Sequence, residues 1–297
     1  MDQVYPANAT VVLRASPQRR RRVIEAAVVQ SVVFSVALAL GCVFLLPFFW
    51  MLSTSVKAPD EVFTFPMQWL PRSIQWENYP RAFTAVPYLR FVENTLTVVV
   101  FAMIGEVLSS TLCAYGFARL RFVGRDVLFV AVLATMMLPE QVTMIPVFVV
   151  FRWLGWVDTF LPLIVPAYFG HPFYIFLLRQ FFMTIPTELE DAARIDGASS
   201  FQILRQIMIP LSMPALATVA IFSFIYHWND FLHPLLYLSS KDMKTLALGL
   251  ALFKGEYSND WNLMMAASVI ALMPCLTIFF LAQRYFIEGI TMTGLKQ

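Results

Sequence analysis

The stretch that organises this sequence is residues 186–214, which read PTELEDAARIDGASSFQILRQIMIPLSMP. Thr187, followed three residues later by Glu190, has the spacing of a capping box, so we predict a helix that begins at Glu188. Acidic side chains occupy its first turn, where the helix dipole favours negative charge. Gly197 has the conformational freedom to end the helix. The stretch therefore predicts a short polar helix with a sharp stop.

A second helix is predicted directly after that stop. Ser199 and Gln202 have the spacing of another capping box. The first helix is too short to be stable alone in water, so a neighbour must hold it. Its face containing Ala192 and Ala193 permits close approach, which suits insertion into a partner's cleft. The alternative is a helix that lies on the protein's own surface.

The composition around this stretch is that of a membrane protein. Of the 297 residues, 59% are hydrophobic and 13% are charged, against about 25% charged in ordinary soluble domains. A helix needs about 20 apolar residues to cross the hydrocarbon core, and six stretches meet this length. We therefore predict an all-α membrane protein with six transmembrane helices, at about 28–52, 96–117, 127–151, 160–182, 208–225 and 263–283.

The basic residues predict the orientation of these spans. Arg19–Arg22 precede the first span, and the short segment Arg119–Arg125 between the second and third is also basic. Because cytoplasmic segments carry the excess of Lys and Arg, we expect both chain ends to be cytoplasmic. We divide the chain into a cytoplasmic tail, residues 1–22, and a transmembrane domain, residues 23–297, with a cytoplasmic loop at 186–207.

Several chemistries have no sequence motif here. The chain has no Gly-Lys pair, so it lacks a phosphate-binding loop, and no zinc-protease or nucleophile-elbow motif is present. The three cysteines lie far apart without a metal-binding or redox spacing. The net charge is +2 with scattered basic residues, so nucleic acid is not an expected partner. We expect a non-catalytic chain without its own metal or cofactor.

Two acidic residues lie inside predicted spans. Ionisable groups at membrane depth are functional hypotheses, so Glu106 and Glu140 are candidates for a proton relay in a secondary transporter. The alternative is a structural role, since polar groups also hold transmembrane helices together. Glu140 follows Pro139 and precedes Pro146, so this helix is expected to break near it.

Aromatic and histidine side chains concentrate near the outer ends of the spans. Trp228 is predicted near the headgroup boundary, and we interpret His227 and His233 beside it as interfacial anchors rather than ligand contacts. His171 is interpreted as a packing or pathway-lining group rather than a metal ligand, since no second ligand stands at a suitable spacing.

The spacing within 186–214 resembles a known family. Asp191-Ala192-Ala193, then three residues, Gly197, nine residues and Ile207 to Pro210, resembles the EAA loop of the integral membrane subunits of ATP-binding-cassette importers. Asp191 replaces the glutamate and Ile209 the leucine of the family pattern, and both changes keep the chemical character. The resemblance covers nearly the whole chain and is greatest to the smaller permease subunit of maltose-type carbohydrate importers. Further matches to that group are Trp69 to Pro71, Asn78-Tyr79, Arg179 to Phe182, Ile195 to Ser199, Trp228 to Phe231 and Gly294 to Lys296.

This resemblance implies a fold and a set of partners. It implies the transmembrane-domain fold of type I ATP-binding-cassette importers in a prokaryotic plasma (inner) membrane, within the lipid bilayer. The chain would pair with a homologous second permease, two cytoplasmic ATPase subunits that bind ATP and Mg²⁺, and an extracytoplasmic binding protein that delivers a disaccharide or oligosaccharide. The residues expected to contact the ATPases are Glu190, Asp191, Ala192, Ala193, Asp196 and Gly197.

The sugar pathway is less well marked in the sequence. Sugars are held by aromatic faces and polar side chains, and the candidates near the fourth and fifth spans are Tyr168, Tyr174, Tyr226 and Asn229. Ordinary packing is the alternative for each, because aromatic rings dominate apolar interfaces. The alternative functions are an ion-gradient-driven secondary transporter or channel, and a membrane scaffold without transport.

Overall fold

The computed structural model describes residues 17–253 and 260–294, and every regular element in these ranges is a helix. Most of the predicted tail, residues 1–16, and part of the Gly294 to Lys296 match lie outside the described residues. The chain forms two compact units that divide after Met51. The first consists of most of helix α1 (Pro17–Ser55), whose segment Val28–Ser55 is long and apolar enough to cross a membrane.

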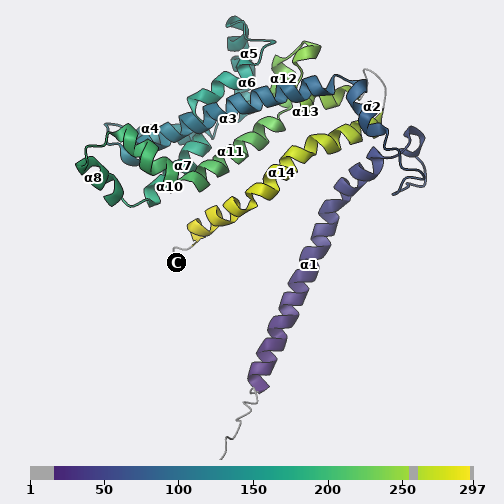
Figure 1. Ribbon diagram of the computed structural model, residues 1–297, viewed down its shortest axis with the longest axis horizontal. Helices are drawn as coiled ribbons and strands as arrows, with labels where there is room; N and C mark the ends of the chain where they lie inside the picture. Colours follow the sequence, from purple (N-terminus) through teal and green to yellow (C-terminus); the bar gives the residue numbers. More distant parts are fainter. Residues whose placement is uncertain (1–16, 254–259, 295–297) are drawn as a thin grey trace, which may run out of the picture. The chain divides into compact units, whose positions relative to one another are not determined.

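The second unit is built around one long helix, α3 (Tyr88–Arg119). It packs against α7 (Pro172–Thr184) and α11 (Met213–Trp228), while α14 (Trp261–Gly294) packs against α11 and α2 (Asn78–Ala85) (Figure 1). The predicted span at 96–117 lies within α3, which is long and apolar enough to cross a membrane. Shorter helices connect these elements: η1 (Pro59–Glu61), α6 (Leu161–Ile164), η2 (Val165–Phe169), α9 (Ser200–Ile203), η3 (Leu204–Met208), α10 (Ile209–Leu211), α12 (Leu232–Tyr237), η4 (Lys241–Met243), α13 (Leu246–Leu250) and η5 (Ala251–Phe253).

Two predicted spans are bent pairs of helices. The stretch predicted at 127–151 forms α4 (Arg125–Thr135) and α5 (Glu140–Trp153), which are inclined at 96°. The break expected near Glu140 is confirmed, because Pro139 has no amide hydrogen and disfavours helical backbone at the residue before it. Within residues 17–253 and 260–294, four helices could each cross a membrane by length and composition, or up to six if each bent pair is one span.

The fifth predicted span begins later than the sequence indicated. Residues Ser200–Leu211 and α11 meet at 80°, so the predicted 208–225 stretch is broken at Ser212. The amide of Ser212 donates to the carbonyl of Met208, and Pro214 lies in the first turn of α11. The apolar run continues across this bend, so composition alone gave no sign of it.

The core of this unit is divided between the two ends of α3. Near its C-terminus, Leu178, Phe182 and Met208 are fully buried. Near its N-terminus, Phe91 packs with Trp228 of α11. Trp228, predicted near the headgroup boundary, has a buried ring, and its indole N–H donates to the carbonyl of Ala271 in α14, at 3.0 Å.

Candidate functional site

The first candidate site is the loop helix α8 (Glu188–Ile195). It begins at Glu188, as predicted, and ends in a Schellman motif. Gly197 has a φ of +84°, which is the left-handed region that favours glycine. The amide of Ala198 donates to the carbonyl of Ala193 at 2.9 Å, and that of Gly197 donates to the carbonyl of Arg194 at 3.0 Å. The predicted glycine stop is therefore confirmed.

The two predicted capping boxes have different outcomes. The second is confirmed, since the amide of Gln202 donates to Ser199 Oγ and the Ser199 amide donates to Gln202 Oε1 at 2.7 Å. The first is wrong, because the Thr187 side chain makes no capping hydrogen bond. Glu190, which was to complete that box, is buried and turned toward α3.

Glu190 forms a buried ion pair with Arg119, the last residue of α3. Their Oε1 and Nε atoms are 2.8 Å apart, and the two side chains are only 4% and 7% exposed. The same guanidinium donates to the carbonyls of Phe182 (2.6 Å), in the last turn of α7, and of Ile185, the residue directly after α7. Arg194 approaches the other carboxylate oxygen at 3.5 Å. Arg119 therefore joins the ends of α3 and α7 to the first turn of α8.

The opposite side of α8 is exposed. Ile195 is 87% exposed, Leu189 is exposed as well, and Asp191, Ala192 and Asp196 are on the surface beside them. Ala193 is half-buried against the core at the α3 C-terminus. Among the predicted ATPase contacts, the structure thus places Glu190 inward, Ala193 at the boundary and the others outward.

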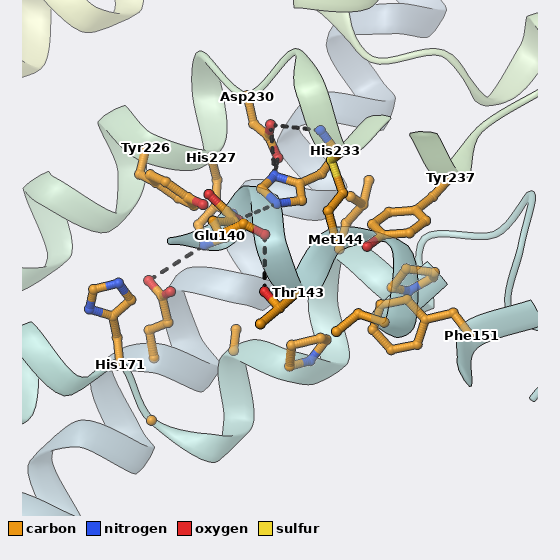
Figure 2. A pocket seen from close by; sticks show the side chains of 17 residues that line it. Glu140, Thr143, Met144, Phe151, His171, Tyr226, His227, Asp230, His233 and Tyr237 are labelled. Carbon is orange, nitrogen blue, oxygen red and sulfur yellow. Dashed lines mark hydrogen bonds and ion pairs between the residues drawn. The ribbon is translucent and has the colours of Figure 1, made fainter. Parts of the chain in front are cut away.

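The second candidate site is a cavity of about 270 Å³ within the second unit (Figure 2). Its walls come from α3, α5, the α6–η2 segment, α11 and α12. Its polar and aromatic lining residues are Glu106, Glu140, Thr143, Phe151, His171, Tyr226, His227, Asp230, His233 and Tyr237.

Carboxylates face imidazoles in this cavity. Glu106 Oε2 lies 3.4 Å from His227 Nε2, and both side chains are buried. His233 lies between two carboxylates, with Nδ1 at 2.9 Å from Asp230 Oδ2 and Nε2 at 2.6 Å from Glu140 Oε1 (Figure 2). The hydrogen bond to Asp230 raises the pKa of His233 above its ordinary value. The interpretation of His227 and His233 as interfacial anchors is wrong, since both line the cavity and pair with carboxylates there.

The predicted pathway residues lie in different surroundings. Tyr226 lines the cavity and is 47% exposed. The ring of Tyr168 lies over Gly105, where an added Cβ would be 2.6 Å from it. Tyr174 is buried, with its ring 4.5 Å from that of His171. Asn229 is exposed and donates to the carbonyl of Ile225 at 2.8 Å.

Sequence reasoning missed the two arrangements that organise these sites. Arg119 was used only as a basic residue that predicts the orientation of the spans, and Asp230 was not singled out as a partner of His233. The Glu140–His233 pair joins residues 93 positions apart. The sequence contained only part of the information needed to find them, namely that Glu106 and Glu140 are ionisable residues within apolar runs.

The sequence has clear relatives among curated proteins. Residues 106–291 match the family described as "Binding-protein-dependent transport system inner membrane component". The arabinooligosaccharides transport system permease protein AraQ of Bacillus subtilis is 34% identical over 86% of this chain and 92% of its own length. The sulfoquinovosyl glycerol transport system permease protein SmoH of Agrobacterium fabrum is 31% identical over 85% of this chain and 89% of its own length.

The fold also has solved counterparts. A chain of a bacterial ABC transporter involved in import of the acidic polysaccharide alginate is 26% identical, with a TM-score of 0.74 over 92% of this chain and 99% of its own. A chain of the MetNI methionine ABC transporter shares the fold, with a TM-score of 0.51 and 18% identity over 68% of this chain and 95% of its own. The chain therefore belongs to the family of binding-protein-dependent transport system inner membrane components.

Proposed function

We propose that this chain is the permease subunit of an ATP-driven importer that moves a disaccharide or oligosaccharide across the inner membrane. Relatives named for arabinooligosaccharide and sulfoquinovosyl glycerol transport support a carbohydrate cargo. The observation that carries the proposal is α8, a helix with one face anchored to the transmembrane helices and the other exposed. Such a helix fits the role of a contact with a partner subunit.

The exposed side of α8 is the proposed ATPase contact. Leu189 and Ile195 offer apolar surface, and Asp191 and Asp196 offer negative charge beside it. Burial of exposed apolar side chains favours association. In this proposal Asp191, Ala192, Ala193 and Asp196 meet the ATPase, Gly197 sets the direction of the chain, and Glu190 anchors the helix.

The buried ion pair supplies the mechanical part of the mechanism. Because Arg119 binds Glu190 and the carbonyls at the end of α7, a displacement of α8 moves α3 and α7 with it. Glu106 lies on the same α3 helix, thirteen residues from Arg119, which is about 20 Å at 1.5 Å per residue. Nucleotide on the ATPases would thus bias the population of inward-facing and outward-facing states.

The complete transporter requires other chains. We propose a homologous second permease, two ATPase subunits that hold ATP and Mg²⁺, and an extracytoplasmic sugar-binding protein. The solved alginate transporter in complex with its periplasmic protein has a chain of the same fold, and supports such an assembly. In this arrangement α8 and both chain ends face the cytoplasm.

Co-purification tests the proposal. Extraction in mild detergent is expected to recover an ATPase and a second permease with this chain, and reconstituted vesicles should take up sugar only with ATP. Ile195→Glu should release the ATPase, because it places a charge on the exposed face of α8. Met67→Glu is the matched control, an exposed apolar residue in the segment between α1 and α2. Recovery of a lone transporter driven by a proton gradient would favour the secondary-transporter alternative and refute the proposal.

A further inference from the structure

The charges that line the cavity are unbalanced. Glu106, Glu140 and Asp230 provide three carboxylates, and the imidazoles come from His171, His227 and His233. None of the described lining residues is Lys or Arg. With the carboxylates ionised, the formal charge is −3 when all imidazoles are neutral and zero when all are protonated. The lining is never positive under these conditions.

The carboxylates of the cavity lining differ in their exposure to solvent. The Glu140 side chain is 53% exposed, that of Asp230 is 13% exposed, and that of Glu106 is 6% exposed. With the imidazoles neutral, both the exposed and the buried parts of the lining therefore carry negative charge. Low-dielectric walls around charges of one sign strengthen their effect on charged ligands.

The cavity also has the shape and aromatic wall of a small-ligand site. Its volume of about 270 Å³ is slightly below the range of ~300–1,000 Å³ for small-molecule pockets, so it suits one sugar unit rather than a whole oligosaccharide. Tyr226 is half-exposed on one side, while Phe151 and Tyr237 pack edge to face at 5.3 Å on another. Sugar hydroxyls can donate hydrogen bonds to carboxylates, which accept only.

We propose that this cavity is a subsite for one unit of an uncharged sugar, and that its carboxylates select against acidic sugars. The inference rests on the proposed function, because it assumes a carbohydrate cargo. An ionised uronate, sulfonate or phosphate would bring a like charge to the carboxylates with no cationic Lys or Arg among the described lining residues. The solved relative is described as importing an acidic polysaccharide, so a shared fold leaves the charge of the cargo open.

Charged thiol reagents test the cavity directly. Tyr226→Cys, in a chain whose Cys42, Cys113 and Cys275 are replaced by Ala, would be assembled into the full transporter and labelled with cationic and anionic methanethiosulfonates. Each reagent's rate constant at the cavity cysteine would be divided by its rate constant with a small thiol in solution. After this normalisation, the cationic reagent should react about tenfold faster than the anionic one. If Tyr226→Cys does not assemble, Thr143→Cys provides a second lining position.

Matched variants show whether the carboxylates cause the preference. Glu140→Gln and Asp230→Asn should each lower the cation-to-anion ratio by several-fold. Glu93→Gln should leave the ratio unchanged, because Glu93 lies on α3 outside the cavity lining and pairs with Arg90. Equal or faster reaction of the anionic reagent, or a ratio unaffected by Glu140→Gln and Asp230→Asn, overturns the inference.

Uptake by the full transporter provides the second arm. Maltotriose and arabinotriose represent neutral cargo, and trigalacturonate and trimannuronate represent acidic cargo. Uptake confined to the neutral group supports the inference, and comparable uptake of an acidic trisaccharide overturns it. If no sugar is taken up and no ATPase co-purifies, the proposed function fails, and the labelling ratio still decides the charge selection of the cavity.

Discussion

The charged residues at positions 106 and 119 of α3 have different kinds of partner. At Arg119, the carboxylate of Glu190 is buried between two guanidinium groups. Thirteen residues earlier on α3, Glu106 faces an imidazole, and Glu140 and Asp230 share a second one. Arginine stays charged at any accessible pH, whereas histidine gains and loses its proton near neutrality. The Arg119–Glu190 pair beside α8 therefore stays charged, whereas the net charge of the cavity lining can change with pH.

This difference matches what each site has to do in the proposed transporter. A joint that transmits motion needs fixed contacts, and Arg119 provides several to α7 and α8 at once. A cavity that holds and releases a ligand needs polar groups that remain accessible, such as Glu140, whose side chain is 53% exposed. The following five predictions each test one side of this comparison.

Loss of Arg119 should have the largest effect. Arg119→Gln leaves Glu190 buried without its main partner, which typically costs about 3–5 kcal/mol. We expect a lower thermal midpoint of the purified complex and loss of ATP-driven uptake. Arg125→Gln is the control, since its ion-pair partner Asp126 is 75% exposed and the loss of such a pair should matter little. Wild-type uptake in Arg119→Gln would show that the pair is not part of the coupling path.

A double variant separates stability from coupling. Arg119→Met with Glu190→Met removes both charges, and buried pairs replaced by apolar residues often retain their stability. We expect a thermal midpoint close to wild type. Uptake should still be reduced, because α8 has lost the ion pair that connects it to α3. Full recovery of uptake would mean that the ion pair contributes only to stability.

A charge at the glycine stop should have the next largest effect. Gly197→Asp forces a side chain into the left-handed region, at roughly 1–2 kcal/mol, and places negative charge at the C-terminal end of α8. No atom lies within 4 Å of its added Cβ, so the cost is conformational and electrostatic rather than steric. We expect ATP-coupled uptake to be abolished with normal membrane insertion. Gly124→Asp is the control, because it has a φ of +81° and equally open space; normal uptake in Gly197→Asp contradicts the coupling role.

The cavity side should respond to pH. Because its folded pKa is raised above 6.5, the stabilisation from protonated His233 is complete below about pH 6.5 and is lost as the pH rises through the raised pKa. The amide exchange rates in α12, divided by the intrinsic rates of an unfolded chain at the same pH, should therefore increase with pH. His233→Gln should remove this dependence. Helix α13 is the internal control, since it contains no titratable side chain. Constant protection of α12 would contradict the prediction.

The smallest effect should distinguish the two predicted caps. Ser199→Ala removes an observed capping box and should cost about 1 kcal/mol. Thr187→Ala removes a hydroxyl that makes no capping bond, so thermal unfolding should be almost unchanged. Equal losses in the two variants would mean that Thr187 caps α8 after all.

The sequence predicted the local features of the fold well. The start of α8 at Glu188 and its stop at Gly197 depend on residues within one or two turns, and both were confirmed. The break beside Pro139 follows from the missing amide hydrogen of proline. The bend at Ser212 was missed, because hydropathy reports how apolar a segment is and not its direction.

The failed prediction at Thr187 shows where local rules end. Thr187 and Glu190 have the spacing of a capping box, yet Glu190 turns toward Arg119. In the fold the Glu190 carboxylate gains two guanidinium partners, Arg119 and Arg194, whereas the capping box would offer it one backbone amide, so the tertiary partner determines the side-chain direction. Nothing near Glu190 in the sequence identifies that partner.

The sequence by itself determined that this chain crosses a membrane, that its helices are apolar, and where the loop helix starts and stops. These properties depend on composition and on hydrogen bonds between near neighbours. Only the tertiary structure decided that Arg119 anchors Glu190 and that His233 lies between Asp230 and Glu140. Such pairs form between helices remote in sequence, and their geometry depends on how the helices pack. The coupling joint and the charge of the cavity are therefore properties of the folded chain.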